Sequence, residues 1–426
     1  MNLRRNAFEI TVFPFVRFKL KPIFPISCLS HCHRELDMFN NDALKYVLPI
    51  IPVRQTEKPG VNSQVEVDLS SSDKKAVGKE RDACIKLFDD FYKHLVRKEN
   101  SVDDKLSTSA GCEKYVKDLV DSIDEYTSSL ANIVSKTPNF ASLQYFYWSS
   151  PLTDKQEMAF DDYRYELLGV YYNVGAILMN IAQYLLCVRV TVGTLSFLEK
   201  DAYRALIKAS AYFHFCANIA DNMKEHEIGV AQVSIPLDVE KEMAIFLESL
   251  ALAQAQEIGV SKAFSADPKE NTETTARLSH QLFLMYEAVC TNARTINTRS
   301  KAFVDISTLS ILKRDIFHAL AYQHAASHLF NKNPGSGLSL LNQGLERATI
   351  VEDYLTKSQK GKLKLPFDAE RFVGLCTKNI RNNTERLNKI NSLVHRAKPD
   401  STKAPLPPPQ PLAIRPDISL SFRLEG

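Results

Sequence analysis

Apolar and polar positions repeat along most of the chain with the spacing of amphipathic α-helices. Apolar residues recur at this spacing between short stretches rich in proline, glycine or asparagine. The pattern predicts helices at about 74–99, 110–136, 160–189, 199–226, 237–265, 272–300, 304–331, 338–359 and 367–396. Successive helices joined by short loops pack antiparallel. We therefore expect a mostly α fold, a stack of helical hairpins with a tetratricopeptide-like core.

The stretch Leu250–Ala263, LALAQAQEIGVSKA, has the composition of a helix covered on several sides. Its four alanines and one glycine let neighbouring backbones approach closely. Gln254, Gln256 and Glu257 lie in the same stretch and need hydrogen-bonding partners if they are buried. The stretch therefore either holds a polar network inside the core or lines a groove.

The two ends of the chain differ from its helical middle. Residues 1–40 are basic and rich in Phe and Pro, and this N-terminal extension is open to interpretation as a strand, a transit peptide or an appended start. Between Leu44 and Leu69, short β-like runs flank the turn Lys58-Pro59-Gly60 and predict a small hairpin or sheet. Residues 401–426 are predicted to form a Pro-rich, extended tail that does not join the helical core. The expected helical domain is 41–400.

The net charge limits which partners are expected, and the cysteine content limits which cellular compartment is expected. A formal net charge of +3 and a pI of about 8.3 are too mild for phosphate tracking, so nucleic acid is not an expected partner. Eight scattered cysteines without paired spacing predict free thiols in a reducing compartment. We therefore expect a cytoplasmic protein.

One charge-free run, Leu167–Val188, has the roughly 20 residues that a bilayer span requires. Asn173 and Asn180 lie within it, and such groups are costly in lipid but ordinary in a buried helix with satisfied polar groups. We favour the buried helix over the membrane span. Because the two asparagines are seven residues apart on one face, we expect both at the centre of the stack.

No pattern in the chain indicates catalysis, a cofactor or a metal. It contains no Gly-rich phosphate loop and no GxSxG motif, and adjacent acidic residues such as Asp89-Asp90 diverge on a helix. His324 and His328 are one turn apart but lack the Glu of an HExxH motif, and the Cys28–His33 cluster has no second pair of ligands. We predict a protein without enzymatic activity.

Three motifs resemble those of the Bro-one (BRO) domain family. In order, they are the aromatic stretch Phe146-Tyr147-Trp148, the sequence YELLGVYYNVGAIL at Tyr165–Leu178, and LAQAQE at Leu252–Glu257. The resemblance covers about residues 41–415 and is strongest to the single-domain branch of the family, although this chain ends in FRLEG without a cysteine for prenylation. It implies a curved, boomerang-shaped helical domain whose concave groove binds the C-terminal helix of an ESCRT-III subunit of the charged multivesicular body type.

The resemblance also implies a set of partner-binding residues. They are Lys200, Gly259, Val260, Lys262, Thr274, Leu278 and Leu282. Lys200 and Lys262 match basic positions beside the groove, and Leu278 matches an apolar contact. Gly259 stands where the family has a large aromatic, and Thr274 where it has a branched aliphatic. These two departures predict weaker partner binding, which Gly259→Phe should strengthen and Leu278→Asp should abolish.

The expected function is a non-enzymatic adaptor of the ESCRT pathway in endosomal sorting or membrane repair, recruited from the cytoplasm to endosomal or other membranes. Two further contacts stay open: an SH3-type module at Pro405–Pro411, and a peripheral membrane surface at the basic run Lys357–Lys364. The alternative function is a helical-repeat scaffold or Rho-effector-like signalling module that lacks ESCRT-III binding.

Overall fold

The computed structural model of the protein forms two compact units, Met1–Asn41 and Asp42–Gly426. It describes residues 46–56, 60–61, 71–97, 109–136, 144–152, 155–160, 162–188, 195–224, 236–265, 272–367 and 369–418, all in the second unit. The predictions for the first 40 residues, including the Cys28–His33 cluster, lie outside the described residues.

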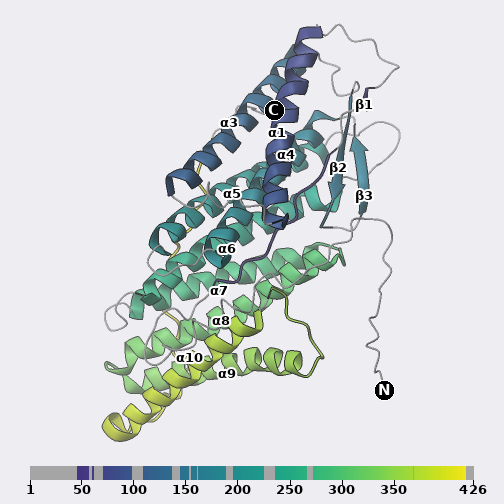
Figure 1. The fold of residues 1–426 in the computed structure, drawn as a ribbon. Helices are drawn as coiled ribbons and strands as arrows, with labels where there is room; N and C mark the ends of the chain where they lie inside the picture. Colours follow the sequence, from purple (N-terminus) through teal and green to yellow (C-terminus); the bar gives the residue numbers. More distant parts are fainter. Residues whose placement is uncertain are drawn as a thin grey trace, which may run out of the picture. The chain divides into compact units, whose positions relative to one another are not determined.

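The described part of the second unit is mostly helical (Figure 1). Its long helices are α1 (Ser71–Arg97), α3 (Ser109–Lys136), α4 (Tyr163–Gln183), α5 (Leu195–Lys224), α6 (Lys241–Ser265), α7 (Thr272–Thr295), α8 (Lys301–Phe330), α9 (Pro334–Gln359) and α10 (Ala369–Ile390). Three short helical segments accompany them: η4 (Tyr184–Val188), η5 (Leu237–Val239) and η6 (Asn391–His395). Every predicted helix has a counterpart, which confirms the mostly α class.

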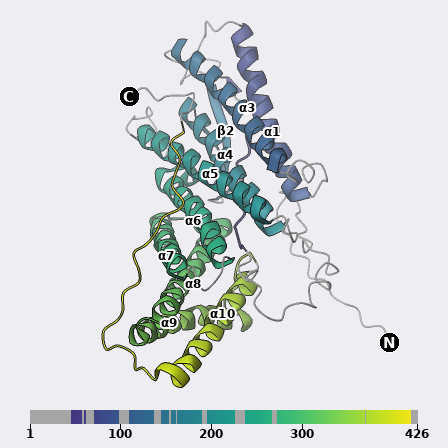
Figure 2. The same cartoon turned by 90° about the vertical axis from the view of Figure 1, so that its left-hand side faces the viewer.

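Helices that follow one another in sequence also pack on one another. From α4 to α9 each helix contacts the next, α1 pairs with α3, and α10 packs on both α8 and α9 (Figures 1 and 2). This is the stack of helical hairpins that short connections predict. One apolar core runs through it, from the first described residues to α10.

The β element lies mainly outside the predicted range. Strands β2 (Gln144–Ser150) and β3 (Lys155–Phe160) form an antiparallel hairpin, and the two-residue strand β1 (Gly60–Val61) pairs with β2. Only β1 falls within the predicted segment Leu44–Leu69. Of the rest of that segment, residues 46–55 belong to no strand, Thr56 forms an isolated antiparallel bridge with Trp148 of β2, and residues 44–45, 57–59 and 62–69 lie outside the described residues. The aromatic run Phe146-Tyr147-Trp148, given above only as a motif, lies in β2. Buried residues alternate there with partly exposed ones, as in a strand with one face on the core.

Two buried asparagines on α4 explain why the segment 46–55 is extended without belonging to a sheet. Asn173 accepts a hydrogen bond from the Arg54 backbone N–H (2.8 Å) and donates one to the Arg54 carbonyl (2.9 Å). Asn180 makes the same pair of bonds with Ile51, at 2.8 and 2.9 Å. Each amide thus supplies the donor and acceptor that a neighbouring strand would provide.

The burial of Asn173 and Asn180 confirms that α4 is an internal helix of the stack. No helix among the described residues is long and apolar enough to cross a membrane. The run Leu167–Val188 is apolar because neighbouring helices cover it.

A buried carboxylate, Glu166, links α4 to three other elements. It accepts hydrogen bonds from Arg81 Nε on α1 (2.7 Å), the Tyr126 hydroxyl on α3 (2.8 Å) and Trp148 Nε1 on β2 (2.7 Å). The Trp148 ring lies so close to α4 at Gly169 that a Cβ at this position would overlap it. The Trp, Glu and Gly of the sequence motifs are therefore packing residues.

A second buried ion pair joins α6 to α8. The Lys313 ammonium lies 2.6 and 2.9 Å from the two carboxylate oxygens of Glu257, which also accepts a hydrogen bond from the Tyr286 hydroxyl (2.8 Å). Lys313 further lies over the rings of Tyr286 and Phe372. Removing one partner would leave the other charge buried without compensation.

Asn173→Leu is expected to lower the free energy of unfolding by roughly 2–5 kcal/mol, because it leaves the buried N–H and C=O of Arg54 without partners. Urea unfolding measures the change. Asn382→Leu, at an exposed site on α10, is the matched control and is expected to change stability by less than about 0.5 kcal/mol. Equal midpoints for Asn173→Leu and wild type would contradict this account of the extended segment.

Lys313→Met is expected to destabilise the protein by roughly 3–5 kcal/mol, since Glu257 then stays buried and charged. The double variant Lys313→Met/Glu257→Leu buries no charge and is expected to recover part of this loss. A double-mutant cycle by guanidinium unfolding measures the coupling. Lys357→Met, which breaks an exposed pair with Asp353, is the control with little expected change. A double variant no more stable than Lys313→Met would disprove the coupling.

Candidate partner-binding surface

The seven predicted binding residues divide into exposed and buried groups. Three are exposed to solvent: Lys200, Lys262 and Thr274. Three are buried in the core: Val260, Leu278 and Leu282. Their direct contact with a partner stays a prediction, and it would require these buried side chains to become accessible. Leu278→Asp would place a carboxylate in the core, so it reports on folding and not on binding.

The structure brings Lys200, Gly259 and Lys262 to one place, where α5 and α6 pack together. Lys262 Nζ lies 3.8 Å from a carboxylate oxygen of Glu199, the residue before Lys200. Gly259 is partly exposed and lies three residues before Lys262 on α6. Glu199 also accepts a hydrogen bond from the Tyr46 hydroxyl (3.0 Å), and burial raises its pKa. Thr274 lies near the start of α7, next to Thr275, whose hydroxyl donates to the carbonyl of Ala263 on α6 (3.5 Å).

The segment after η6, residues 397–418, crosses the helical stack in extended conformation and is called the arm below. Figure 2 shows it running from the end of α10 past α9 and α7 toward α5. Gln343 on α9 donates a hydrogen bond to the Ala404 carbonyl (3.3 Å). At the far end, Arg415 pairs with Glu248 on α6 (2.6 Å). The predicted tail is thus extended as expected, but it does join the helical core.

The proline-rich part of the arm is held against α7. The carbonyl oxygen of Pro407 lies 2.7 Å from His280 Nδ1, and that of Pro408 accepts a hydrogen bond from Arg277 Nε (3.3 Å). The Gln410 N–H donates to the Arg277 carbonyl (3.1 Å). An SH3-type module at Pro405–Pro411, which stays a prediction, would have to compete with these contacts.

Gln256 on α6 binds the arm by its side-chain amide. Its Nε2 donates to the Gln410 carbonyl (3.0 Å), and its Oε1 accepts from the N–H groups of Leu412 (2.8 Å) and Ala413 (3.1 Å). The Tyr203 hydroxyl on α5 donates to the Leu412 carbonyl (2.9 Å). Sequence reasoning identified Gln256 as needing a partner but could not find one 154 residues away.

The first alternative for the stretch Leu250–Ala263, polar groups with partners inside the core, describes Gln256 and Glu257. The buried Gln256 amide binds the arm, and Glu257 belongs to the buried ion pair. Gln254 is buried, and its amide has no hydrogen-bond partner within the described part of the chain.

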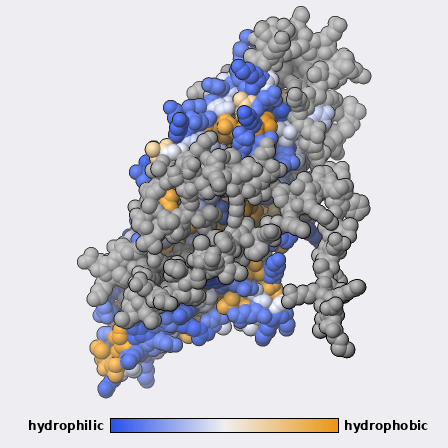
Figure 3. All heavy atoms as spheres, viewed as in Figure 1, coloured by the Kyte–Doolittle hydropathy of each residue, from blue (hydrophilic) through white to orange (hydrophobic). Residues whose placement is uncertain are grey.

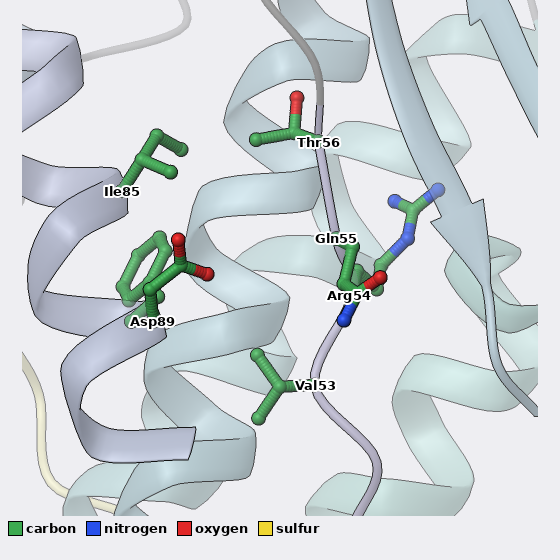
Figure 4. Close-up of a pocket in the computed structure, with 7 residues that line it drawn as sticks. Val53, Arg54, Gln55, Thr56, Ile85 and Asp89 are labelled. Atoms are coloured by element: carbon green, nitrogen blue, oxygen red, sulfur yellow. The ribbon is translucent and has the colours of Figure 1, made fainter. Parts of the chain in front are cut away.

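A pocket between the extended segment and α1 offers no reactive group. It is lined by Val53, Arg54, Gln55, Thr56, Ile85, Phe88 and Asp89. Figure 4 shows the Arg54 guanidinium directed away from α1. It donates hydrogen bonds to the Tyr165 hydroxyl and the Ser149 carbonyl, both at 2.8 Å, so Arg54 has a structural role.

His324 and His328, which were considered above as metal ligands, contact different partners. His324 packs edge-on against Phe264 (4.2 Å between ring centroids), and burial lowers its pKa to about 4. His328 lies 3.1 Å from Glu273. Within the described ranges, no three possible ligands gather into a site.

Two exposed apolar residues, Leu393 and Val394, lie just after α10. The hydropathy surface shows apolar atoms gathered at this end of the stack (Figure 3). This patch is remote in sequence from Lys200, Gly259 and Lys262 and was not predicted.

Three solved structures share the fold, while no curated protein matches the sequence. The "ALIX BRO1 CHMP4C complex" has a TM-score of 0.61 at 15% identity, covering 89% of this chain and 98% of that chain. "Structure basis for endosomal targeting by the Bro1 domain" has a TM-score of 0.57 at 16% identity, covering 87% and 93%. "Crystal Structure of ALIX in complex with the SIVmac239 PYKEVTEDL Late Domain" has 0.61 at 14% identity, covering 89% and 50%.

The family follows from a match over most of the sequence. The resemblance expected from the three motifs spans about residues 41–415, and the model of the BRO1-like domain matches residues 50–417. The helical stack described above has the fold of solved BRO1 domains. The chain therefore belongs to the BRO1-like domain family.

Proposed function

We propose that the chain is a non-enzymatic adaptor of the ESCRT pathway that binds the C-terminal helix of an ESCRT-III subunit. The main support is the family match over residues 50–417, together with the similarity to the ALIX BRO1 domain in its complex with CHMP4C. The family consists of adaptor domains, which agrees with the predicted lack of enzymatic activity.

The proposed contact surface is the face of α5 and α6 that carries Lys200, Gly259 and Lys262. Both lysines are exposed, and positive charge beside an apolar surface suits a helix that has acidic residues along its apolar stripe. Val260 on α6 and Leu278 and Leu282 on α7 are buried in the apolar core. Thr274 belongs to the proposal only as an exposed neighbour on α7.

The contact between Gly259 and the arm changes the expectation for Gly259→Phe. A Cβ at this position would lie 2.5 Å from Leu412 Cδ1. A phenylalanine would therefore have to displace the arm before it could contact a partner. Substitution of the lysines does not require the arm to move, because both side chains are exposed and Lys262 pairs with the Glu199 carboxylate on α5.

The proposed site of action is the surface of endosomes or other membranes, to which the protein is recruited from the cytoplasm for sorting or membrane repair. A structurally similar domain is described as acting in endosomal targeting. Peripheral contact of the basic run Lys357–Lys364 with anionic lipid is a further part of this proposal.

Lys200→Glu/Lys262→Glu is expected to weaken binding of a CHMP4C C-terminal helix peptide about tenfold or more, since two favourable charge contacts become repulsive. Calorimetry with the full chain measures this. Wild-type affinity is also expected to fall as the salt concentration rises.

The matched control is Lys360→Glu/Lys362→Glu, which changes the net charge equally at exposed lysines between α9 and α10. Its affinity is expected to stay within about twofold of wild type, because charges beyond roughly one Debye length are screened. Equal losses in both double variants would mean that binding follows net charge and not this surface. A wild-type chain that does not bind the peptide would disprove the proposed function.

A further inference from the structure

We infer that Leu412 and Ile414 of the arm form the apolar part of the partner-binding surface, beside the basic residues of α5 and α6. The inference rests on the proposed function and names the side chains through which this site would hold a helix. It makes the arm a component of the site, although the arm lies about 150 residues from α6 in sequence.

Leu412 lies directly against α6 at Gly259. Leu412 Cδ1 lies 2.5 Å from the place of a Cβ at Gly259, so a larger residue here would require the Leu412 side chain to move. Glycine at position 259 therefore does not leave a hole in the surface. The side chain that fills the space comes from the arm.

The backbone around Leu412 is fixed on both sides. Its N–H donates to Gln256 Oε1 and its carbonyl accepts from Tyr203, so α6 and α5 each hold one of its polar groups. The next N–H, of Ala413, also donates to Gln256, and the Ala413 side chain is buried. A partner that contacts this segment would not have to order it first, which lowers the entropic cost of binding.

Leu412 and Ile414 nevertheless remain accessible, with 40% and 68% of their surfaces exposed. Side chains alternate along an extended chain, so Leu412 and Ile414 lie on the opposite side from the buried Ala413, and Leu412 is the less exposed of the two because its tip contacts α6 at Gly259. At about 3.3 Å per residue, their Cα atoms are roughly 7 Å apart. Exposed apolar side chains on a fixed backbone are suited to contact the apolar stripe of a helix.

The charges around these two residues favour an acidic partner. Lys200 and Lys262 are exposed on α5 and α6, and Arg415 follows Ile414 on the arm. Two of these positive charges are offset by carboxylates, since Lys262 pairs with Glu199 and Arg415 with Glu248, so among the residues that the structure describes here Lys200 is the exposed cation that stays available for a partner. The surface thus has an apolar centre with basic residues beside it, which fits an amphipathic helix with leucine-like residues along one face and acidic residues next to them.

Leu412→Ala/Ile414→Ala in the full chain is expected to weaken the CHMP4C helix peptide about tenfold or more in calorimetry, because apolar anchors dominate such interfaces. The matched control is Ile350→Ala/Val394→Ala, whose residues are 41% and 68% exposed at other sites. This control is expected to bind within about twofold of wild type. Ile414→Asp is expected to abolish binding while leaving the urea midpoint unchanged, since most of this side chain is in solvent.

The outcomes separate this inference from the proposed function. If the arm variants bind like wild type while Lys200→Glu/Lys262→Glu still weakens binding, the helix docks without the arm and the inference is wrong. If the wild-type chain does not bind, the proposed function fails and the inference with it. If Ile414→Asp lowers the midpoint as much as the affinity, the arm acts on folding alone, which also overturns the inference.

A second pair of variants tests the contact between Gly259 and Leu412. Gly259→Ala forces the Leu412 side chain to turn from its place against α6 and is expected to weaken binding. In Gly259→Ala/Leu412→Ala the collision is relieved, so its affinity is expected to equal that of Leu412→Ala alone. Additive losses would mean that the two residues act independently, which contradicts the inferred arrangement.

Discussion

The fold depends on the way in which α4 satisfies polar groups inside an apolar core. Glu166, Asn173 and Asn180 are buried on this helix, and each would be strongly destabilising without its partners. Glu166 binds groups from α1, α3 and β2, while the asparagines bind backbone groups at Arg54 and Ile51. An apolar contact tolerates sliding, but these hydrogen bonds are satisfied in one arrangement only. They therefore fix which elements surround α4 and in what register.

The same reasoning explains which residues form the sequence motifs. Trp148 and Glu166 bind each other, Gly169 makes room for the indole, and Glu257 pairs with Lys313. Each of these residues has a partner far away in sequence, so replacing one leaves a buried group unpaired or two groups overlapping. This accounts for short recognisable motifs in a chain whose identity to the ALIX BRO1 domain is only 15%. The motifs indicate the fold, and the proposed binding surface is formed by other residues.

Features that depend on local interactions could be predicted from the sequence, whereas features that depend on partners distant in sequence could not. The helices were predictable because their apolar periodicity and end signals are local. The burial of Asn173 and Asn180 was predictable from their spacing on one face. The form of the segment 46–55 was not, because its partners are the amides of α4 more than 100 residues away. A pattern of apolar residues there indicated a strand, and only the tertiary structure shows an extended segment held by side chains.

The candidate site could likewise be predicted only in part. Lys200 and Lys262 are exposed as a basic surface requires, but periodicity could not tell that Leu278 faces inward, since core and contact residues on a packed helix are equally apolar. The arm could not be placed at all, because proline-rich composition predicts an extended conformation and not its docking partner. Its position depends on side chains from several helices, among them the amide of Gln256, which satisfies one carbonyl and two N–H groups of the arm.

The role of Gly259 cannot be judged from α6 alone. As an isolated helix position, glycine lacks a side chain for a partner to contact and costs about 1 kcal/mol of helix propensity relative to alanine. In the folded chain the same absence of a side chain lets Leu412 lie against the helix. Gly259 and Leu412 therefore form one contact: α6 has no side chain at Gly259, and the Leu412 side chain of the arm fills this space. A chain with a large residue at 259 must place its arm differently, so the two positions have to be compared together when partner preference within the family is explained.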